Sequence, residues 1–227
     1  MPDIKESWST ASQSRIPVAM PLPFVHLRLH SEYSITDGLT RIDSVVERAV
    51  ADAQPALALT DLANLFGMVK FYSAARKRGI KPLIGCDVWI GDGDVTDTRD
   101  VPTRLLLLCR TRAGFLRLCE LLSVAYLTPR RHGRAEIQRT AFSSGDNSGL
   151  IALSGAAGGD VGTALLTGKL LDAEQRAKDW AQLFPDAYYI EVQRPAARQG
   201  SPMPPFQRHA ARPIPRRVAP CRASRPR

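Results

Sequence analysis

The sequence predicts an α/β fold in which about six strands alternate with helices. Apolar segments of strand length alternate with segments of roughly 10–15 residues at helical spacing, the order typical of right-handed parallel βα units. Residues 24–30 alternate between apolar and mostly nitrogen-bearing side chains, which indicates a strand with one buried face. Four consecutive leucines, Leu105–Leu108, indicate a strand buried on both faces.

The elements are predicted in order along the chain. The expected strands are 24–30, 56–60, 80–90, 103–110, 150–154 and 188–192, and the expected helices are 41–53, 64–78, 113–127, 161–166 and 173–184. Asp37 or Thr40 is expected to cap the first helix, and Gly79 to end the second. The contact face predicted for the second helix consists of Phe66, Val69, Tyr72 and Ala75. Residues 128–148 are predicted to form a loop.

The composition divides the chain into three parts. Residues 1–22 are polar and Ser-rich, which predicts a flexible extension, with Met20 as an alternative start. Residues 23–194 are expected to form one folded domain. Residues 195–227 contain eight Arg and eight Pro with no Lys, Asp or Glu, so we expect a disordered tail. Two interpretations remain open for the tail: a basic nucleic-acid-binding arm, or the favoured one, out-of-frame translation of GC-rich coding sequence.

The net charge of +9 does not by itself indicate a nucleic-acid-binding protein. Removing the eight tail arginines from 31 basic residues leaves 23, against 22 acidic residues, so the body of the chain is nearly neutral. The four cysteines show no zinc-binding spacing. There is no apolar run of membrane-spanning length and no signal-peptide pattern, so we expect a cytoplasmic protein without a membrane partner.

The first predicted strand also indicates a site. It directs His26, Arg28 and His30 to one face and leads into Ser34 and Asp37. Strands of α/β barrels deliver His and Asp side chains in this way to metal-assisted active sites. The alternative is an edge strand with a solvated polar face, and the pattern alone leaves both open.

Two blocks of sequence resemble a known family. They are HLRLHSEYSITDG at 26–38 and ALTDLANLFGMVKFYSAARKRGIKPLIGCDVWI within 56–90. From about Phe24 to about Val192 the chain resembles the N-terminal PHP (polymerase and histidinol phosphatase) domain of bacterial DNA polymerase III α subunits, of proteobacterial type. The resemblance implies a distorted (β/α)7 barrel, which this chain would form only in part.

The resemblance also implies which positions correspond to the family's metal site. They are Arg28, His30, Asp37, Asp61, Leu62, Asp87, Arg104 and Ala156. Active members use His, Asp, Glu and Cys ligands there, and an arginine guanidinium cannot coordinate a cation. Only His30, Asp37, Asp61 and Asp87 keep possible donor atoms. We therefore expect a degenerate site with no catalytic residue and no bound metal.

The resemblance implies a function in DNA replication within a DNA-directed DNA polymerase, a nucleotidyltransferase. The PHP domain is expected to act in a structural role and as a docking surface for the proofreading exonuclease subunit, alongside other replicase subunits. Mg²⁺ and DNA would bind polymerase domains that this chain lacks, so it is expected to be inactive alone. The alternatives are a stand-alone metal-dependent PHP phosphoesterase and a non-catalytic protein-interaction module.

Overall fold

The computed structural model describes residues 24–92, 101–128 and 133–193. The predicted extension over 1–22 and the predicted tail over 195–227 lie outside these ranges, so both stay predictions. Among the described residues, no helix combines the length and apolar character needed to cross a bilayer.

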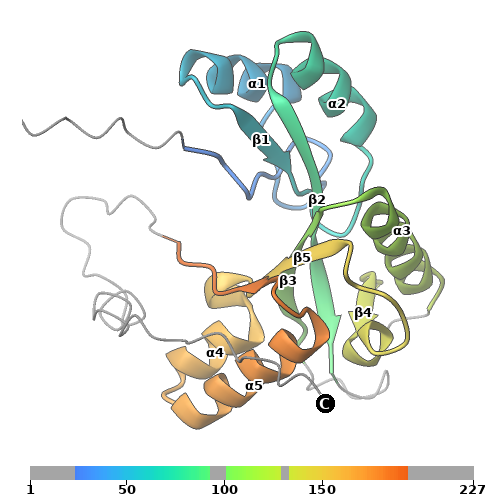
Figure 1. Cartoon of the computed structure of the whole chain (residues 1–227), viewed down its shortest axis with the longest axis vertical. Helices are drawn as coiled ribbons and strands as arrows, with labels where there is room; N and C mark the ends of the chain where they lie inside the picture. Colours follow the sequence, from blue (N-terminus) through green and yellow to red (C-terminus); the bar gives the residue numbers. More distant parts are fainter. Residues whose placement is uncertain (1–23, 93–100, 129–132, 194–227) are drawn as a thin grey trace, which may run out of the picture.

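Six strands form one curved sheet with helices on its outer side (Figure 1). The strands are β1 (Ala56–Leu59), β2 (Lys81–Gly91), β3 (Thr103–Cys109), β4 (Glu136–Gln138), β5 (Leu150–Leu153) and β6 (Tyr188–Tyr189). The helices are α1 (Ile42–Ala51), α2 (Met68–Lys77), α3 (Arg112–Leu127), α4 (Asp160–Leu166) and α5 (Leu170–Leu183), with the short 3-10 helices η1 (Arg139–Phe142) and η2 (Ala156–Gly158). The strand order is β1-β2-β3-β5-β6, and β4 pairs with β2. The sheet is not closed, as an incomplete barrel requires.

The sheet is mixed, which corrects the prediction of parallel βα units throughout. β1 pairs parallel with β2, but β3 runs antiparallel to both β2 and β5. The connection over residues 92–102 is shorter than the dozen or so residues that a parallel crossover needs. Composition and periodicity carry no information about strand direction, so this connection length was the available signal.

Residues 24–30 do not form a regular strand, contrary to the prediction. They run alongside β1 with one bridge, His26 to Leu57, and two backbone hydrogen bonds, from Ala58 N to His26 O and from Thr60 N to Leu29 O, each 2.9 Å. In a regular parallel ladder, successive hydrogen bonds are two residues apart on both strands. Here the two donors, Ala58 and Thr60, are two residues apart, but the two acceptors, His26 and Leu29, are three residues apart. We call residues 24–30 the first segment.

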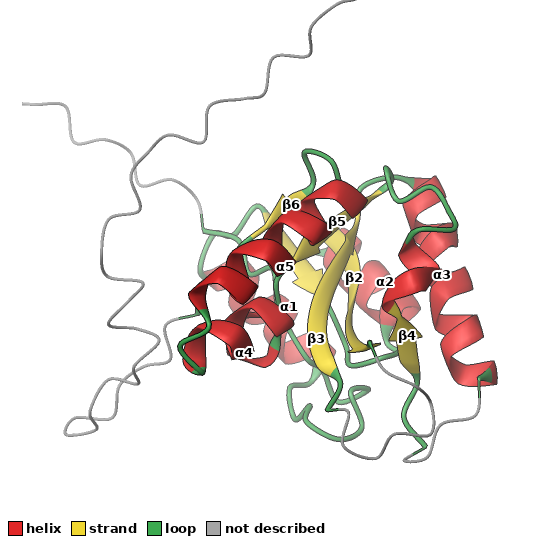
Figure 2. Ribbon diagram, turned by 90° about the horizontal axis from the view of Figure 1, so that it is seen from below, coloured by secondary structure: helices red, strands yellow, loops and turns green. Residues whose placement is uncertain are grey.

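Most of the core lies on the outer side of the sheet. The outward-facing leucines of β3 and β5 pack with α3, α4 and α5, and a second cluster fills the space between β1 and the pair α1 and α2. Figure 2 shows α4 and α5 beside β3, with α3 at the other end of the sheet. On the concave inner face the fully buried apolar cluster contains only Ala58, Leu106 and Leu108. All four leucines Leu105–Leu108 are buried, as predicted.

Helix α2 begins at Met68 rather than at Asn64, and this changes which of its residues are buried. Asn64 accepts a hydrogen bond from the Phe66 backbone N–H in the loop before the helix, at 3.0 Å. Phe71 and Ala75 are buried, whereas the predicted contact residues Phe66, Val69 and Tyr72 are half or more exposed. Gly79 ends the helix region with φ +76°, as predicted.

Two further predictions are wrong in detail. The N-cap of α1 is Arg41, without a side-chain cap, and Asp37 accepts instead from Ser34 Oγ at 2.7 Å. The predicted loop over 128–148 contains β4 and η1. A three-residue strand is too short to show alternation, so it left no signal in the sequence.

Candidate metal centre at the end of the sheet

Asp87 on the inner face of β2 is the centre of the candidate site, and its side chain is fully buried. Three cationic or potentially cationic groups contact one of its oxygens, Oδ2. Arg28 Nη1 makes a short contact, Arg104 Nη2 lies at 2.6 Å and His30 Nε2 at 3.1 Å. The other oxygen, Oδ1, has no hydrogen-bond partner among the described residues.

Burial and neighbouring charges act in opposite directions on Asp87. Burial alone would raise the pKa of this carboxyl group, because removal from water disfavours the charged form. The hydrogen bonds from His30 and Arg104 and the charges of Arg28 and Arg104 outweigh burial, so the pKa lies below its ordinary value. Asp87 is therefore an ionised carboxylate at neutral pH.

Arg28 connects this carboxylate to the far end of the sheet. Its Nε and Nη2 atoms each lie 2.8 Å from a carboxylate oxygen of Glu191, which follows β6. Burial lowers the pKa of the guanidinium, but the hydrogen bond that it donates to Glu191 and the charges of Asp87 and Glu191 raise it above the ordinary value. Arg28 remains charged and is neutralised by two carboxylates.

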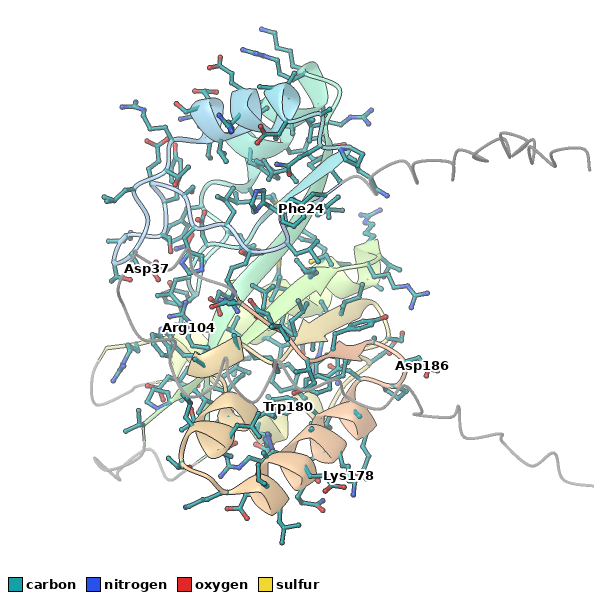
Figure 3. All side chains as sticks on the ribbon, turned by 90° about the vertical axis from the view of Figure 1, so that its left-hand side faces the viewer. Phe24, Asp37, Arg104, Lys178, Trp180 and Asp186 are labelled. Atoms are coloured by element: carbon teal, nitrogen blue, oxygen red, sulfur yellow. The ribbon has the colours of Figure 1, made fainter. Side chains whose placement is uncertain are left out.

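His30 lies between two carboxylates. Its Nδ1 is 3.0 Å from Asp37 Oδ2, and its Nε2 faces Asp87. Both ring nitrogens can donate only when each carries a proton. Arg104 Nη2 is also 3.7 Å from Asp37, and its guanidinium lies 4.6 Å from the centroid of the Trp89 ring. Figure 3 shows Asp37 and Arg104 near one another and far from Trp180.

Asp61, which follows β1, has a separate set of partners. It accepts hydrogen bonds from the Ser31 backbone N–H at 2.6 Å and from Ser31 Oγ at 2.9 Å. Burial raises the pKa of its carboxyl group, and the two Ser31 hydrogen bonds only partly oppose this. Asp61 thus holds the turn after the first segment.

Two other positions expected at the site contribute apolar side chains. Leu62 bridges Asp87 through its backbone, and its side chain packs against the large outer core. Ala156 is buried in η2 with φ +49°. It follows Gly155, where a Cβ atom would lie 2.2 Å from the Arg104 carbonyl oxygen, so only glycine fits there. Neither side chain offers a metal ligand.

The residues present do not fit a metal cluster. Both His30 nitrogens lie within hydrogen-bonding distance of a carboxylate, Asp87 Oδ2 contacts two guanidinium groups, and Asp61 is hydrogen-bonded to Ser31. The described residues contain no group of three or more His, Cys, Asp or Glu side chains arranged to hold an ion. One unpaired oxygen of Asp87 does not suffice, because divalent cations take several ligands. Two guanidinium groups beside it would also repel a cation.

The cluster brings groups of opposite charge together. Asp37, Asp87 and Glu191 face Arg28, Arg104 and the His30 ring. We call these six residues the ion-pair cluster. Sequence reasoning missed Glu191, although it lies near the end of the predicted strand 188–192, as His30 lies at the end of the first segment. The same criterion, a polar residue at the carboxyl end of a strand, would have identified it.

Comparison with known proteins gives consistent results. A family model with the description PHP domain matches residues 26–195. DNA polymerase III subunit alpha of Neisseria meningitidis serogroup A is 48% identical over 172 residues, which cover 75% of this chain and 15% of that protein. The protein of the same name from Escherichia coli K12 is 39% identical over 189 residues, covering 83% of this chain and 16% of that one. The chain thus spans about 15% of the length of these relatives.

Solved structures give only weak similarity. An amidohydrolase from Chromobacterium violaceum, solved with bound sulfate and no metal, is 28% identical and covers 45% of this chain and 33% of its own. The TM-score is 0.35, at which the similarity carries no argument.

Proposed function

This chain belongs to the PHP domain family, and from that premise we propose that it is a non-catalytic PHP domain of the DNA polymerase III α type, with an ion-pair cluster in place of a metal site. Its role is structural, and its surface docks a proofreading exonuclease subunit. The resemblance to the PHP domain of α subunits rests on the family match and on the relatives.

One observation carries the proposal. Arg28, Arg104 and His30 converge on the single buried oxygen Asp87 Oδ2. A hydrolytic metal site needs carboxylates and imidazoles whose lone pairs are free to bind cations and a bridging water. Here Asp87 Oδ2 accepts from guanidinium groups of the protein itself, and only Asp87 Oδ1 is left without a partner among the described residues. The cluster can hold polypeptide segments together, but it offers no metal and no activated water.

The names of the relatives support a place in a replicase, and the docking role is our proposal from that place. They are α subunits of DNA polymerase III, a replicase component. A domain without hydrolytic chemistry can assist proofreading only by positioning a separate exonuclease. DNA polymerase activity belongs to relatives that are far longer than this chain, and we do not assign it to residues 1–227.

A stand-alone metal-dependent phosphoesterase is the main alternative. It requires divalent ions at positions where the structure places Arg28 and Arg104. A pure protein-interaction module outside the replicase is the second alternative. It shares the absence of catalysis and differs from the proposal only in its partner.

Two measurements test the proposal. Elemental analysis of the purified chain should find less than one Zn²⁺, Mn²⁺ or Fe ion per chain, and hydrolysis of p-nitrophenyl phosphate with added Mn²⁺ should equal the rate without protein. Two or more bound ions together with metal-dependent hydrolysis would establish the phosphoesterase instead. Pull-down with the proofreading exonuclease subunit of the same replicase then separates the docking role from an unrelated interaction module.

A further inference from the structure

Several exposed cations lack a carboxylate partner, and most of these lie in two connections of the fold. Elsewhere on the surface, Arg48 lies 3.0 Å from Asp52 and Arg78 lies 2.8 Å from Glu47. Within the described ranges, five exposed cations have no such side-chain partner: Arg76, Lys77, Lys81, Arg110 and Arg112. We call these five residues the basic patch. Their charges are available to a partner outside the chain.

The fold brings the basic patch to one end of the sheet. Arg76 and Lys77 lie in the last turn of α2, and Lys81 begins β2. Arg110 follows β3, and Arg112 begins α3. Because β3 is antiparallel to β2, β3 ends where β2 begins. The ion-pair cluster lies toward the carboxyl end of the parallel strand β1, so the two groups of charges are at opposite ends of the sheet.

Carboxylates on the neighbouring elements have other contacts. Glu47 of α1 pairs with Arg78, and Glu120 of α3 lies 2.8 Å from Arg117. Asp146, in the loop beside the β3–α3 turn, accepts a backbone N–H of its own loop at 2.8 Å. The body of the chain is nearly neutral as a whole, but its charge is therefore unevenly distributed.

The residues among these cations indicate the kind of partner. Ser73, Gly79, Thr111 and Ala113 are exposed and small, so they provide no large anchor. Protein–protein interfaces have large anchor residues and few charges at their centre. Protein–DNA interfaces are far more positively charged, and Lys and Arg contact phosphates without reading the sequence. The basic patch therefore fits a phosphate backbone better than a protein surface.

We propose that the basic patch binds the phosphate backbone of duplex DNA without sequence preference. A duplex carries one negative charge per roughly 1.7 Å of its axis, so cations in two connections can contact several phosphates at once. The choice of a phosphate backbone rests on the patch alone. The choice of DNA rests on the proposed function within a replicase. The binding surface is separate from the ion-pair cluster and involves no catalysis.

The test measures how much each half of the patch contributes to binding. Fluorescence anisotropy would follow a labelled duplex of about 20 base pairs and mixed sequence, titrated with the full chain at several salt concentrations. Residues 195–227 carry eight arginines in every variant, so differences between variants are the readout.

Both halves of the patch should contribute. The variants Arg76→Gln/Lys77→Gln and Arg110→Gln/Arg112→Gln should each weaken binding about threefold or more at about 50 mM salt, and all four substitutions together about tenfold or more. The slope of log affinity against log salt should become shallower by about 0.9 for each lost phosphate contact.

A matched control removes the same charge elsewhere. Lys169 and Arg176 of the α5 region also have no side-chain partner among the residues that the structure covers. Lys169→Gln/Arg176→Gln should leave the affinity within about twofold and the salt slope unchanged. Circular dichroism and thermal unfolding check each variant. If a double variant has lost its fold, the single variants Lys77→Gln and Arg112→Gln replace it.

Three outcomes would overturn the proposal. The first is patch variants that behave like the control, which would assign DNA binding to residues 195–227. The second is patch variants that lose the proofreading exonuclease in pull-down but keep their DNA affinity, which would make the patch a protein-docking surface. The third is a preference of more than about tenfold for one duplex sequence, which would indicate contacts to bases. None of these outcomes changes the metal content or phosphatase assay of the proposed function, so the two proposals can fail separately.

Discussion

Arg28 and Glu191 are 163 positions apart in the chain, yet they form a two-bond ion pair with both nitrogen–oxygen distances at 2.8 Å. One residue belongs to the first segment and the other follows the last strand. The same arginine also contacts the buried carboxylate of Asp87 on β2. A single side chain thus links three parts of the curved sheet.

Arg28→Ala should lower the free energy of unfolding by about 2–4 kcal/mol, because it leaves Asp87 and Glu191 short of a partner at a largely buried site. Urea unfolding followed by circular dichroism measures the change. The control Arg48→Ala removes an exposed i,i+4 pair with Asp52 and should change stability by less than about 0.5 kcal/mol. Equal effects of the two substitutions would show that Arg28 does not link the sheet ends.

Acidification should destabilise the chain through Asp87. Its pKa in the folded state lies below the ordinary value of 3.8, so the unfolded chain takes up this proton at a higher pH than the folded chain does. The ionised Asp87 carboxylate therefore contributes to stability at pH values above the ordinary pKa, and this contribution is lost as the pH falls from about 5 toward the lowered pKa. Urea midpoints between pH 7 and pH 3 should therefore decrease, and Asp87→Asn should flatten the decrease while lowering stability at pH 7.

Protonation of Asp61 should change the stability in the opposite direction to protonation of Asp87. Burial raises its pKa above 3.8 in the folded state, so its protonation on acidification favours the folded chain. Asp61→Asn removes this compensation and should steepen the loss of stability between about pH 5 and pH 3. A smaller loss of stability with falling pH in the Asp61→Asn variant would contradict a raised pKa for Asp61.

The triple variant Arg28→His/Leu62→His/Arg104→His should increase the affinity for Mn²⁺ or Zn²⁺ by about tenfold or more. It removes both guanidinium groups that occupy Asp87 Oδ2 and puts imidazoles in their place, with a third imidazole at the neighbouring position 62. Single reversions should have little effect, because each leaves at least one arginine or a missing ligand. Calorimetric titration measures the affinity, with Arg48→His as a control, and an unchanged triple variant would count against the family alignment.

Cys109 should react slowly with iodoacetamide at pH 8. Burial raises the pKa of its thiol to about 12, so the reactive thiolate is scarce at this pH. Mass spectrometry of labelled peptides should show modification of Cys109 at least about tenfold slower than that of glutathione in the same solution. After unfolding in urea, the two rates should become similar, and rapid labelling of the folded chain would show that β3 opens at its end.

The sequence predicted the fold where periodicity or a long apolar run marked an element. Leu105–Leu108 became the centre of β3, and α3 lies within one residue of the predicted helix. The direction of β3 was missed because its residue pattern does not differ from that of a parallel strand. The short connection between β2 and β3 was the sign that the two strands are antiparallel. The three-residue β4 was missed because it is shorter than one period of any pattern.

The candidate site was only partly predictable. The structure brings Arg28, His30, Asp37, Asp87 and Arg104 together, positions that the family alignment had selected. Glu191 did not correspond to any expected ligand, because its partner, Arg28, is itself a replacement. An alignment finds what occupies a position of the family's site, and the position of Glu191 near the end of a predicted strand could mark it as a candidate, but its pairing with Arg28 is visible only in three dimensions.

The residues of the ion-pair cluster share partners, so a single substitution in it affects more than one ion pair. Changing Arg28 alone leaves Glu191 without its two-bond partner, and changing Arg104 alone removes one of the donors to the buried Asp87. Each first step back toward a ligand set destabilises the domain before any cation can compensate for it. A change of this cluster into a ligand set therefore requires several substitutions to be made together.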